Sequence, residues 1–315
     1  MLEDSGANAV SGWATAILPG PANESTQTVT FTATADNTGL FAVQPAISSN
    51  GTLSYTPAAD AFGVATVTVT ARDDGGTANG GVDTSSPVTF TITIDPVNDM
   101  PGFTAGANQS VLEDATTQSV NGWAAALSVG PPNESSQVLS FDAVADNPGL
   151  FAIQPAVNPT GKLTFKPAPD ANGVATVSVH VHDNGGTANG GIDGTPDQVF
   201  TITIGAVNDA PSFTAGPDQV VVSLLGNATV PGWATNILEG PADESSQNVS
   251  FAVTNDNPGL FATQPAVAPD GTLTFQTTAL ALGSATVTVR AVDNGGTANG
   301  GVDTSPPQTF TITVI

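Results

Sequence analysis

Two short segments carry oxygen-bearing side chains at one spacing. They are residues 97–101 (VNDMP) and residues 207–211 (VNDAP). An Asn-Asp pair offers carboxylate and amide oxygen atoms, whose charge water, a cation or a neighbouring domain must neutralise. Each segment follows an alternating run, residues 90–94 or 200–204, that predicts a strand, and each ends in a proline that stops the strand. We therefore interpret both segments as joints between domains.

The sequence repeats with a period of 110 residues. Trp13, Trp123 and Trp233 are 110 residues apart, and so are three copies of the loop sequence GGTANGG. A period of this length is too long for a solenoid repeat and is the size of one β-sandwich. We predict three domains, at residues 1–98, 99–208 and 209–315. The first copy has no counterpart of residues 102–110, so we expect Met1 to start inside a first strand.

Each repeat reads as a series of short strands separated by Pro and Gly turns. In the second copy the expected strands are residues 110–112 with 122–127, then 137–145, 151–157, 161–166, 175–182 and 198–204. Apolar residues alternate with Thr and Ser, which predicts one buried and one wet face. About seven strands in one repeat indicate an immunoglobulin-like sandwich. The tryptophans could be platforms for sugar stacking, but their equal register favours core packing.

The composition limits the classes of function. The 315 residues include 4 Lys+Arg against 28 Asp+Glu, giving a formal charge of -24, and no cysteine. So few cations argue against binding nucleic acid or anionic lipid, and the acidity is compatible with cation binding. Disulfides and thiolate zinc sites are excluded. No segment resembles a signal peptide or membrane helix, so we expect no membrane insertion and any export signal to lie outside this chain.

Three features together carry a resemblance to a known family. They are the two joints, the sequence Asp183-Asn-Gly-Gly, and the run from Gly161 to Gly173 that reads GKLTFKPAPDANG. The combination resembles the cadherin-like and Ig-like tandem repeats of large bacterial surface proteins and adhesins. This resemblance covers all three repeats. It implies an elongated rod of β-sandwiches outside the cell, a role in cell adhesion, and Ca²⁺ as the cofactor at each joint.

The resemblance also implies which residues hold calcium. For the first joint they are Glu3, Asp60, Asp95, Asn98, Asp99, Asp146 and Asp183; for the second they are Glu113, Asp170, Asn208, Asp209, Asp256 and Asp293. Calcium takes six to eight oxygen ligands, and clustered carboxylates repel one another until a cation binds. Asp95 corresponds to Gly205, so the second joint is expected to hold fewer ions or to hold them more weakly.

The third repeat provides an internal control, because we expect no joint after it. Glu113, Asp114 and Asp170 correspond there to Ser223, Leu224 and Leu280, whereas Asp256 and Asp293, assigned to the upper end, remain acidic. A merely solvated surface predicts no such division.

Two expectations concern the ends of the chain. The first repeat keeps the acids Asp36 and Asp73, so we expect another domain, or another molecule, before Met1. At the far end Leu224, Leu225, Leu280 and Leu282 form a hypothetical docking surface.

Other chemistry has little support. His180 and His182 lie two apart on a predicted strand, hence on one face, where they could hold a transition metal. Neither histidine recurs in the other repeats, and two ligands do not complete a zinc site, so the sequence alone favours no such site. Two histidines and no cysteine leave little material for nucleophilic catalysis, and the acids recur at domain ends and not in one cleft. We therefore predict a protein that is not an enzyme.

Three functions remain at this stage. The first is a structural module, a calcium-stiffened stalk segment of an adhesin or fibre. The second is a filament subunit that joins copies head to tail. The third is a multivalent module in which the GGTANGG loops bind a glycan or a protein on a cell surface. In the first two, the partners are neighbouring domains of the same or another copy.

Overall fold

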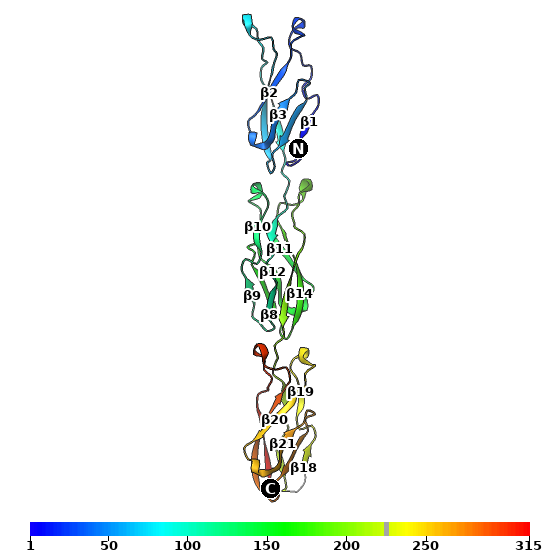
Figure 1. Ribbon diagram of the computed structural model, residues 1–315, viewed down its shortest axis with the longest axis vertical. Helices are drawn as coiled ribbons and strands as arrows, with labels where there is room; N and C mark the ends of the chain where they lie inside the picture. The colour runs from blue at the N-terminus through cyan, green and yellow to red at the C-terminus, as the bar shows by residue number, and fades with distance from the viewer. Residues whose placement is uncertain (224–226) are drawn as a thin grey trace.

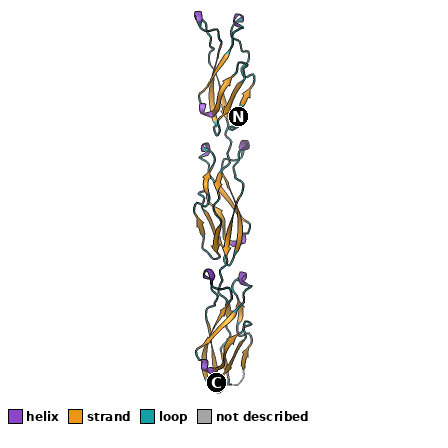
Figure 2. Cartoon of the chain, viewed as in Figure 1, coloured by secondary structure: helices purple, strands orange, loops and turns teal. Residues whose placement is uncertain are grey.

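Three β-sandwiches follow one another along a rod (Figure 1). The computed structural model describes residues 1–223 and 227–315. Strands and loops make up these residues, with short 3-10 turns of three residues each (Figure 2). Within them, no helix is long and apolar enough to cross a membrane. The predicted all-β class with tandem sandwiches is confirmed, whereas the domain boundaries at residues 98/99 and 208/209 stay a prediction.

Domain two has one large and one small sheet and a short ribbon. The large sheet has the order β11 (Ser140–Ala145), β14 (Gly173–His182), β15 (Gln198–Gly205) and β8 (Gln109–Leu112), and only β8 runs parallel to its neighbour. The small sheet contains β12 (Phe151–Val157), β13 (Leu163–Pro167) and β9 (Gln118–Val120), and the ribbon pairs β10 (Ala125–Ser128) with β7 (Gly102–Thr104). The sequence predicted about seven strands, and the structure has two more, β7 and β9. Their absence from the prediction has a simple cause: at three residues each, they are too short to show alternation.

Domain three repeats this arrangement. Its large sheet has the order β17 (Gln219–Val221), β24 (Gln308–Val314), β23 (Gly283–Val292) and β20 (Ser250–Asn255). The remaining strands are β18 (Asn227–Val230), β22 (Leu273–Thr277) and β21 (Phe261–Val267) in one sheet, with β16 (Ser212–Thr214) paired to β19 (Thr235–Leu238).

Domain one has two three-stranded sheets. They are β2 (Thr30–Ala35), β5 (Gly63–Arg72) and β6 (Val88–Ile94), and β1 (Asn8–Val10), β4 (Leu53–Pro57) and β3 (Phe41–Ile47). Leu2 forms a parallel bridge with Asp95, at the place where β8 pairs with β15 in domain two.

Each domain has its own apolar core. Along β14, Ala175, Val177, Val179 and Val181 are fully buried and alternate with outward-facing residues, as the sequence pattern requires. The described core residues form three separate clusters, one in each sandwich. Each sandwich therefore has its own basis for stability, independent of the joints.

The tryptophans belong to these cores. Trp123 is 3% exposed, lies 4.4 Å from Phe200 between ring centroids, and donates its Nε1–H to the carbonyl of Ala107. Trp233 is equally buried, so the predicted core packing is confirmed for both residues. Trp13 is only half-buried, because residues 102–110, which cover Trp123, align with no residue of domain one.

The direction of the long strands defines the two ends of each sandwich. We call the end that receives the preceding linker the upper end, and the opposite end the lower end. Strand β14 runs from the lower end of domain two to its upper end, and β11 pairs with β14 antiparallel, so β11 runs downward. At the lower end of domain three, Leu280 and Leu282 are 90% and 72% exposed, while Leu224 and Leu225 lie outside the described residues.

Candidate metal centres at the two joints

The asparagine of each linker is fixed in the upper end of the following domain. The Asn98 side chain donates to Asp183 Oδ1 at 3.0 Å and to the Ile192 carbonyl at 2.8 Å, and its Oδ1 accepts from Gln137 Nε2 at 2.8 Å. Asn208 makes the same three bonds, to Asp293, Val302 and Gln247. Each linker is thereby locked to the domain that follows it.

The GGTANGG loop lines the place where the Asn98 side chain is held, which we call the Asn98 seat. In domain two the loop connects β14 to β15, and Gly185 and Gly191 face Asn98. A Cβ atom on Gly185 would overlap the Asn98 amide, and one on Gly191 would lie 2.9 Å from the Asn98 Cβ. The Ile192 N–H also donates to the Asn98 carbonyl at 2.9 Å. Gly185 and Gly191 are therefore required by the close approach of the linker.

The preceding domain brings three acids to the first joint. Glu3, which is 2% exposed, accepts the Val97 N–H through Oε1 at 2.8 Å. Asp4 and Asp60 occupy left-handed turn positions with φ of 58° and 53°, a conformation that Asp tolerates better than most residues. Carboxylate oxygens of Asp4, Asp60 and the linker residue Asp99 lie within 4.8 Å of one another.

The following domain adds two buried acids from its upper end. Glu134 closes the 3-10 turn η4 (Pro132–Glu134), is 6% exposed, and accepts the Asp99 N–H through Oε1 at 2.9 Å. Asp183 is 7% exposed and accepts the Gly185 N–H in addition to the Asn98 amide. The first joint thus gathers carboxylates from the preceding domain, the linker and the following domain.

The second joint repeats the arrangement. Asp114, Asp170 and Asp209 bring carboxylate oxygens within 4.8 Å of one another. Glu113 accepts the Val207 N–H, Glu244 accepts the Asp209 N–H, and Asp293 holds Asn208.

The structure brings most of the predicted ligands to the joints, with three exceptions. The Asp95 carboxylate is 54% exposed and faces the Met1 amino group at 3.7 Å, outside the cluster. Asp146 and Asp256 accept backbone N–H groups of Thr176 and Thr286, near the lower ends of their domains. The assignment of Asp146 and Asp256 to the upper ends is therefore not supported, because β11 and β20 end at the opposite end of the sandwich from β14 and β23.

Four residues in the clusters were absent from the predicted ligand sets. They are Asp4, Asp114, Glu134 and Glu244. The sequence did contain a signal for them: an Asp follows the glutamate at positions 3 and 113, and a Glu recurs at positions 24, 134 and 244, one period apart.

Burial and mutual charge repulsion raise the pKa values of carboxyl groups at the joints. Burial raises the pKa of Glu3, Asp99 and Glu134 above the ordinary carboxyl values. The charges of Asp4 and Asp60 raise the pKa of both Glu3 and Asp99 further. At the second joint the pKa of Asp209 and of Glu244 is raised for the same reasons. These groups resist ionisation where the protein gathers them.

Several buried oxygens at the joints have no hydrogen-bond partner among the described residues. They include the second carboxylate oxygens of Glu3, Asp99, Glu134, Asp183, Glu244 and Asp293. A buried carboxylate oxygen without a donor is costly, and a cation removes that cost. The donors are hard oxygen atoms from several chain segments, which is the ligand type that Ca²⁺ prefers.

The chain is similar to solved cadherin ectodomain structures. With mouse Protocadherin-24 EC1-3 it shares 15% identity over 99% of this chain and 95% of that one, with a TM-score of 0.43. With protocadherin Gamma B2 domains 1-5 the values are 16% over 91% and 53%, TM-score 0.47, and with Drosophila N-cadherin EC1-4 they are 14% over 91% and 67%, TM-score 0.34. No protein-family model and no curated protein matches the sequence. The sandwich architecture follows from the strand pairing itself.

The Asn98 seat leads to a first prediction. Replacing Gly185 with Ala places a methyl group where the Asn98 amide lies, so the linker leaves its seat and the first joint becomes flexible. Small-angle scattering should then report a broader distribution of maximum dimensions. Gly75→Ala is the matched control, because its methyl group would meet only the flexible Gln27 side chain in domain one. Equal scattering from both variants would contradict the role of the seat.

The raised pKa values lead to a second prediction. A carboxyl group whose pKa is higher in the folded than in the unfolded chain stabilises the fold fully below the unfolded value, and this stability is lost as pH rises through the folded value. In chelator, Tm is therefore expected to rise as the pH falls from neutral toward the ordinary carboxyl pKa of about 4. With Ca²⁺ bound the sign reverses, because protons compete with the ion for the same oxygens.

Calorimetry at several pH values, in chelator and in calcium, measures how Tm depends on pH in each case. The double variant Asp99→Asn/Glu134→Gln removes two of the groups with a raised pKa and should flatten the pH dependence in chelator. The same dependence of Tm on pH in chelator and in calcium would contradict this prediction.

Proposed function

We propose that this chain is a non-enzymatic extracellular spacer, a stalk segment of a bacterial surface adhesin or fibre, whose two joints bind Ca²⁺ and thereby become stiff. One observation carries the proposal. At each joint, carboxylates from the preceding domain, the linker and the following domain converge, and buried oxygens of this cluster have no donor among the residues that the structure describes. Residues that serve only for solubility have no reason to meet in this way.

The residues that would hold calcium are drawn from all three sources. At the first joint they are Glu3, Asp4, Asp60, Asp99, Glu134 and Asp183, and at the second they are Glu113, Asp114, Asp170, Asp209, Glu244 and Asp293. In this proposal Asn98 and Asn208 position the linker, because their side-chain amides bond to Asp183 and Gln137 and to Asp293 and Gln247. Bound calcium would supply the positive charge that the joint lacks.

The hydrogen bonds of the linker indicate which domain would move when calcium dissociates. The linker is held to the following domain by the Asn98 seat, and to the preceding domain by the end of β6 and the bond from Val97 to Glu3. Among the described residues, no hydrogen bond or ion pair joins the two sandwiches directly at the first joint, so a bound ion would be the direct bridge. Without the ion, the preceding domain is expected to swing about the linker on the following one.

The alternative functions fit the geometry less well. In domains two and three the GGTANGG loops already hold the linker asparagine, so their use as glycan- or protein-binding loops competes with the joint. A head-to-tail filament would meet Ser223 and Leu280 at the lower end of domain three, where the joints have Glu and Asp. Such a contact would not rebuild the carboxylate cluster.

Scattering with calcium and then with chelator tests the proposal. Calcium should lengthen and stiffen the three-domain rod, and chelation should broaden its distribution of dimensions. Asp60→Asn/Asp99→Asn should weaken calcium binding at the first joint, because it removes two of the three clustered charges. Asp256→Asn is the control: this acid lies at the lower end of domain three, and its loss should leave the calcium titration unchanged. Identical curves with and without calcium would refute the proposal.

The two joints should also differ in chelator. At the second joint Asn172 of domain two donates to Asp243 of domain three at 2.9 Å, and also to Glu113 at 3.3 Å. Phe62 and Asn133 occupy the corresponding positions at the first joint and make no such bond. We therefore expect the second joint to be the better closed one without an ion, and the expectation from Gly205, that it holds fewer ions or holds them more weakly, stays a prediction.

Spin labels at exposed, equivalent sites measure this difference. Cysteines at Val43 and Val144 report on the first joint, and cysteines at Ile153 and Thr254 report on the second, in a chain that has no other cysteine. In chelator the second pair should give the narrower distance distribution. Asn172→Phe should widen it to match the first pair, and equal widths in the unaltered joints would contradict the prediction.

A further inference from the structure

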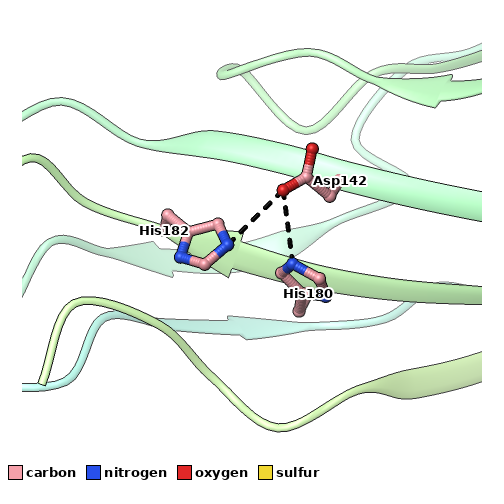
Figure 3. A group of neighbouring side chains, drawn as sticks. All are labelled: Asp142, His180 and His182. Carbon is pink, nitrogen blue, oxygen red and sulfur yellow. Dashed lines mark ion pairs between the residues drawn. The ribbon is translucent and has the colours of Figure 1, made fainter.

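Domain two carries a group of three ligand-type side chains away from both joints. Asp142 lies on β11, and His180 and His182 lie on β14, all on the outward face of the large sheet (Figure 3). The strand register places Asp142 directly opposite His180 and one diagonal step from His182. Both imidazole rings point toward the Asp142 carboxylate (Figure 3). The sequence showed the two histidines, and the strand pairing adds the third residue.

The distances within this group match a tetrahedral metal site. Asp142 Oδ2 lies 3.3 Å from His180 Nε2 and 3.4 Å from His182 Nε2. Ligands bound tetrahedrally at 2.0–2.1 Å from a zinc ion are separated by about 3.3–3.4 Å. The three ligand atoms all lie within 4.8 Å of one another.

A fourth residue fixes the ring of His180. Asp197 Oδ1 lies 2.8 Å from His180 Nδ1. An ionised carboxylate only accepts hydrogen bonds, so this contact places a ring proton on Nδ1 and leaves Nε2 as the nitrogen that faces Asp142 Oδ2. Once Nε2 carries no proton, it and the carboxylate oxygen are placed to bind one cation between them. A carboxylate behind the ligating histidine is also the usual outer partner in zinc sites.

The group is open to solvent on one side. The side chain of Asp142 is 65% exposed, and those of His180 and His182 are 30% and 38% exposed. An ion can therefore enter without unfolding, and water can complete its coordination. The site occurs once in the chain, because the equivalent positions are Thr32, Thr70 and Arg72 in domain one and Ala252, Arg290 and Val292 in domain three.

We propose that Asp142, His180 and His182 form a transition-metal site for Zn²⁺ or Cu²⁺, distinct from the oxygen-only clusters at the joints. Imidazole nitrogen selects these borderline metals, whereas Ca²⁺ prefers oxygen. Asp142 supplies the carboxylate oxygen, the two histidines supply nitrogen, and Asp197 orients His180. The inference is independent of the stalk function, because the site lies within one domain.

Metal titration of the full chain tests the site. Calorimetry with ZnCl₂ at about pH 7.5, where an ordinary imidazole is neutral, is carried out in excess calcium so that the joints are occupied. The unaltered chain should bind one Zn²⁺ more than the double variant His180→Gln/His182→Gln. Asp197→Asn should weaken this binding about 10- to 100-fold without abolishing it, as loss of an outer partner does. Asp256→Asn should bind like the unaltered chain.

A spectroscopic measurement identifies the ligand atoms. Electron paramagnetic resonance of the chain with one equivalent of Cu²⁺ should show hyperfine coupling to two imidazole nitrogens, absent from the double variant. Circular dichroism of the variant establishes that the sheet is intact, which this exposed position favours. Equal zinc binding by the unaltered chain and the double variant, or a copper spectrum without nitrogen coupling, would overturn the proposal.

Discussion

The joints depend on one constraint: buried carboxylates such as those of Glu3, Glu134 and Asp183 gather with less buried aspartates, and no Lys or Arg among the described residues balances them. The chain has 4 Lys and Arg residues in total. Arg72 pairs with Asp83 in domain one, Arg290 donates to the Ser305 carbonyl in domain three, and no described Lys or Arg forms an ion pair at a joint. Unpaired charges of one sign in a shielded place repel strongly. The surrounding structure must therefore hold acids together against their own repulsion.

The backbone of the linker shows how this is done. Glu3 from the preceding domain accepts the Val97 N–H, and Glu134 from the following domain accepts the Asp99 N–H. Two N–H groups two residues apart are thus held from opposite sides, while Asn98 between them fills its own seat. Each glutamate uses one oxygen for the linker and keeps the second, unpartnered oxygen for the joint. A single residue type therefore both positions the linker and contributes to the cluster.

The sequence predicted the repeats, the sandwiches and the joints because these depend on local pattern and on period. It misplaced Asp146 and Asp256 because their location depends on strand direction: a residue after β11 and a residue after β14 emerge at opposite ends. It also missed Asp142 as a partner of the histidines, since only the pairing of two strands far apart in sequence brings them together. Glu134 was within reach, as it recurs in every repeat, but its contact with the linker N–H depends on the fold of the upper loops.

Several of the acids accept hydrogen bonds from the backbone of their own domain. Asp183 accepts the N–H of Gly185 within its own loop, and Asp73 accepts the N–H of Gly75 in the same way although no linker is seated there. Asp36 likewise accepts the Thr66 N–H within domain one. These acids have local roles in shaping loops, so their presence in domain one carries no information about what precedes Met1.

The lower-end acids behave differently. Asp60 and Asp170 occupy left-handed positions with φ of 53°, and the third repeat has Leu280 at the equivalent place. Asp is favoured over Leu in that conformation, but Leu280 itself adopts φ of 61°, so this turn does not require the carboxylate. What the carboxylate adds is charge directed at the next linker. At both joints the lower-end Glu-Asp pair and its distant Asp are therefore the acids that the preceding domain directs at the linker.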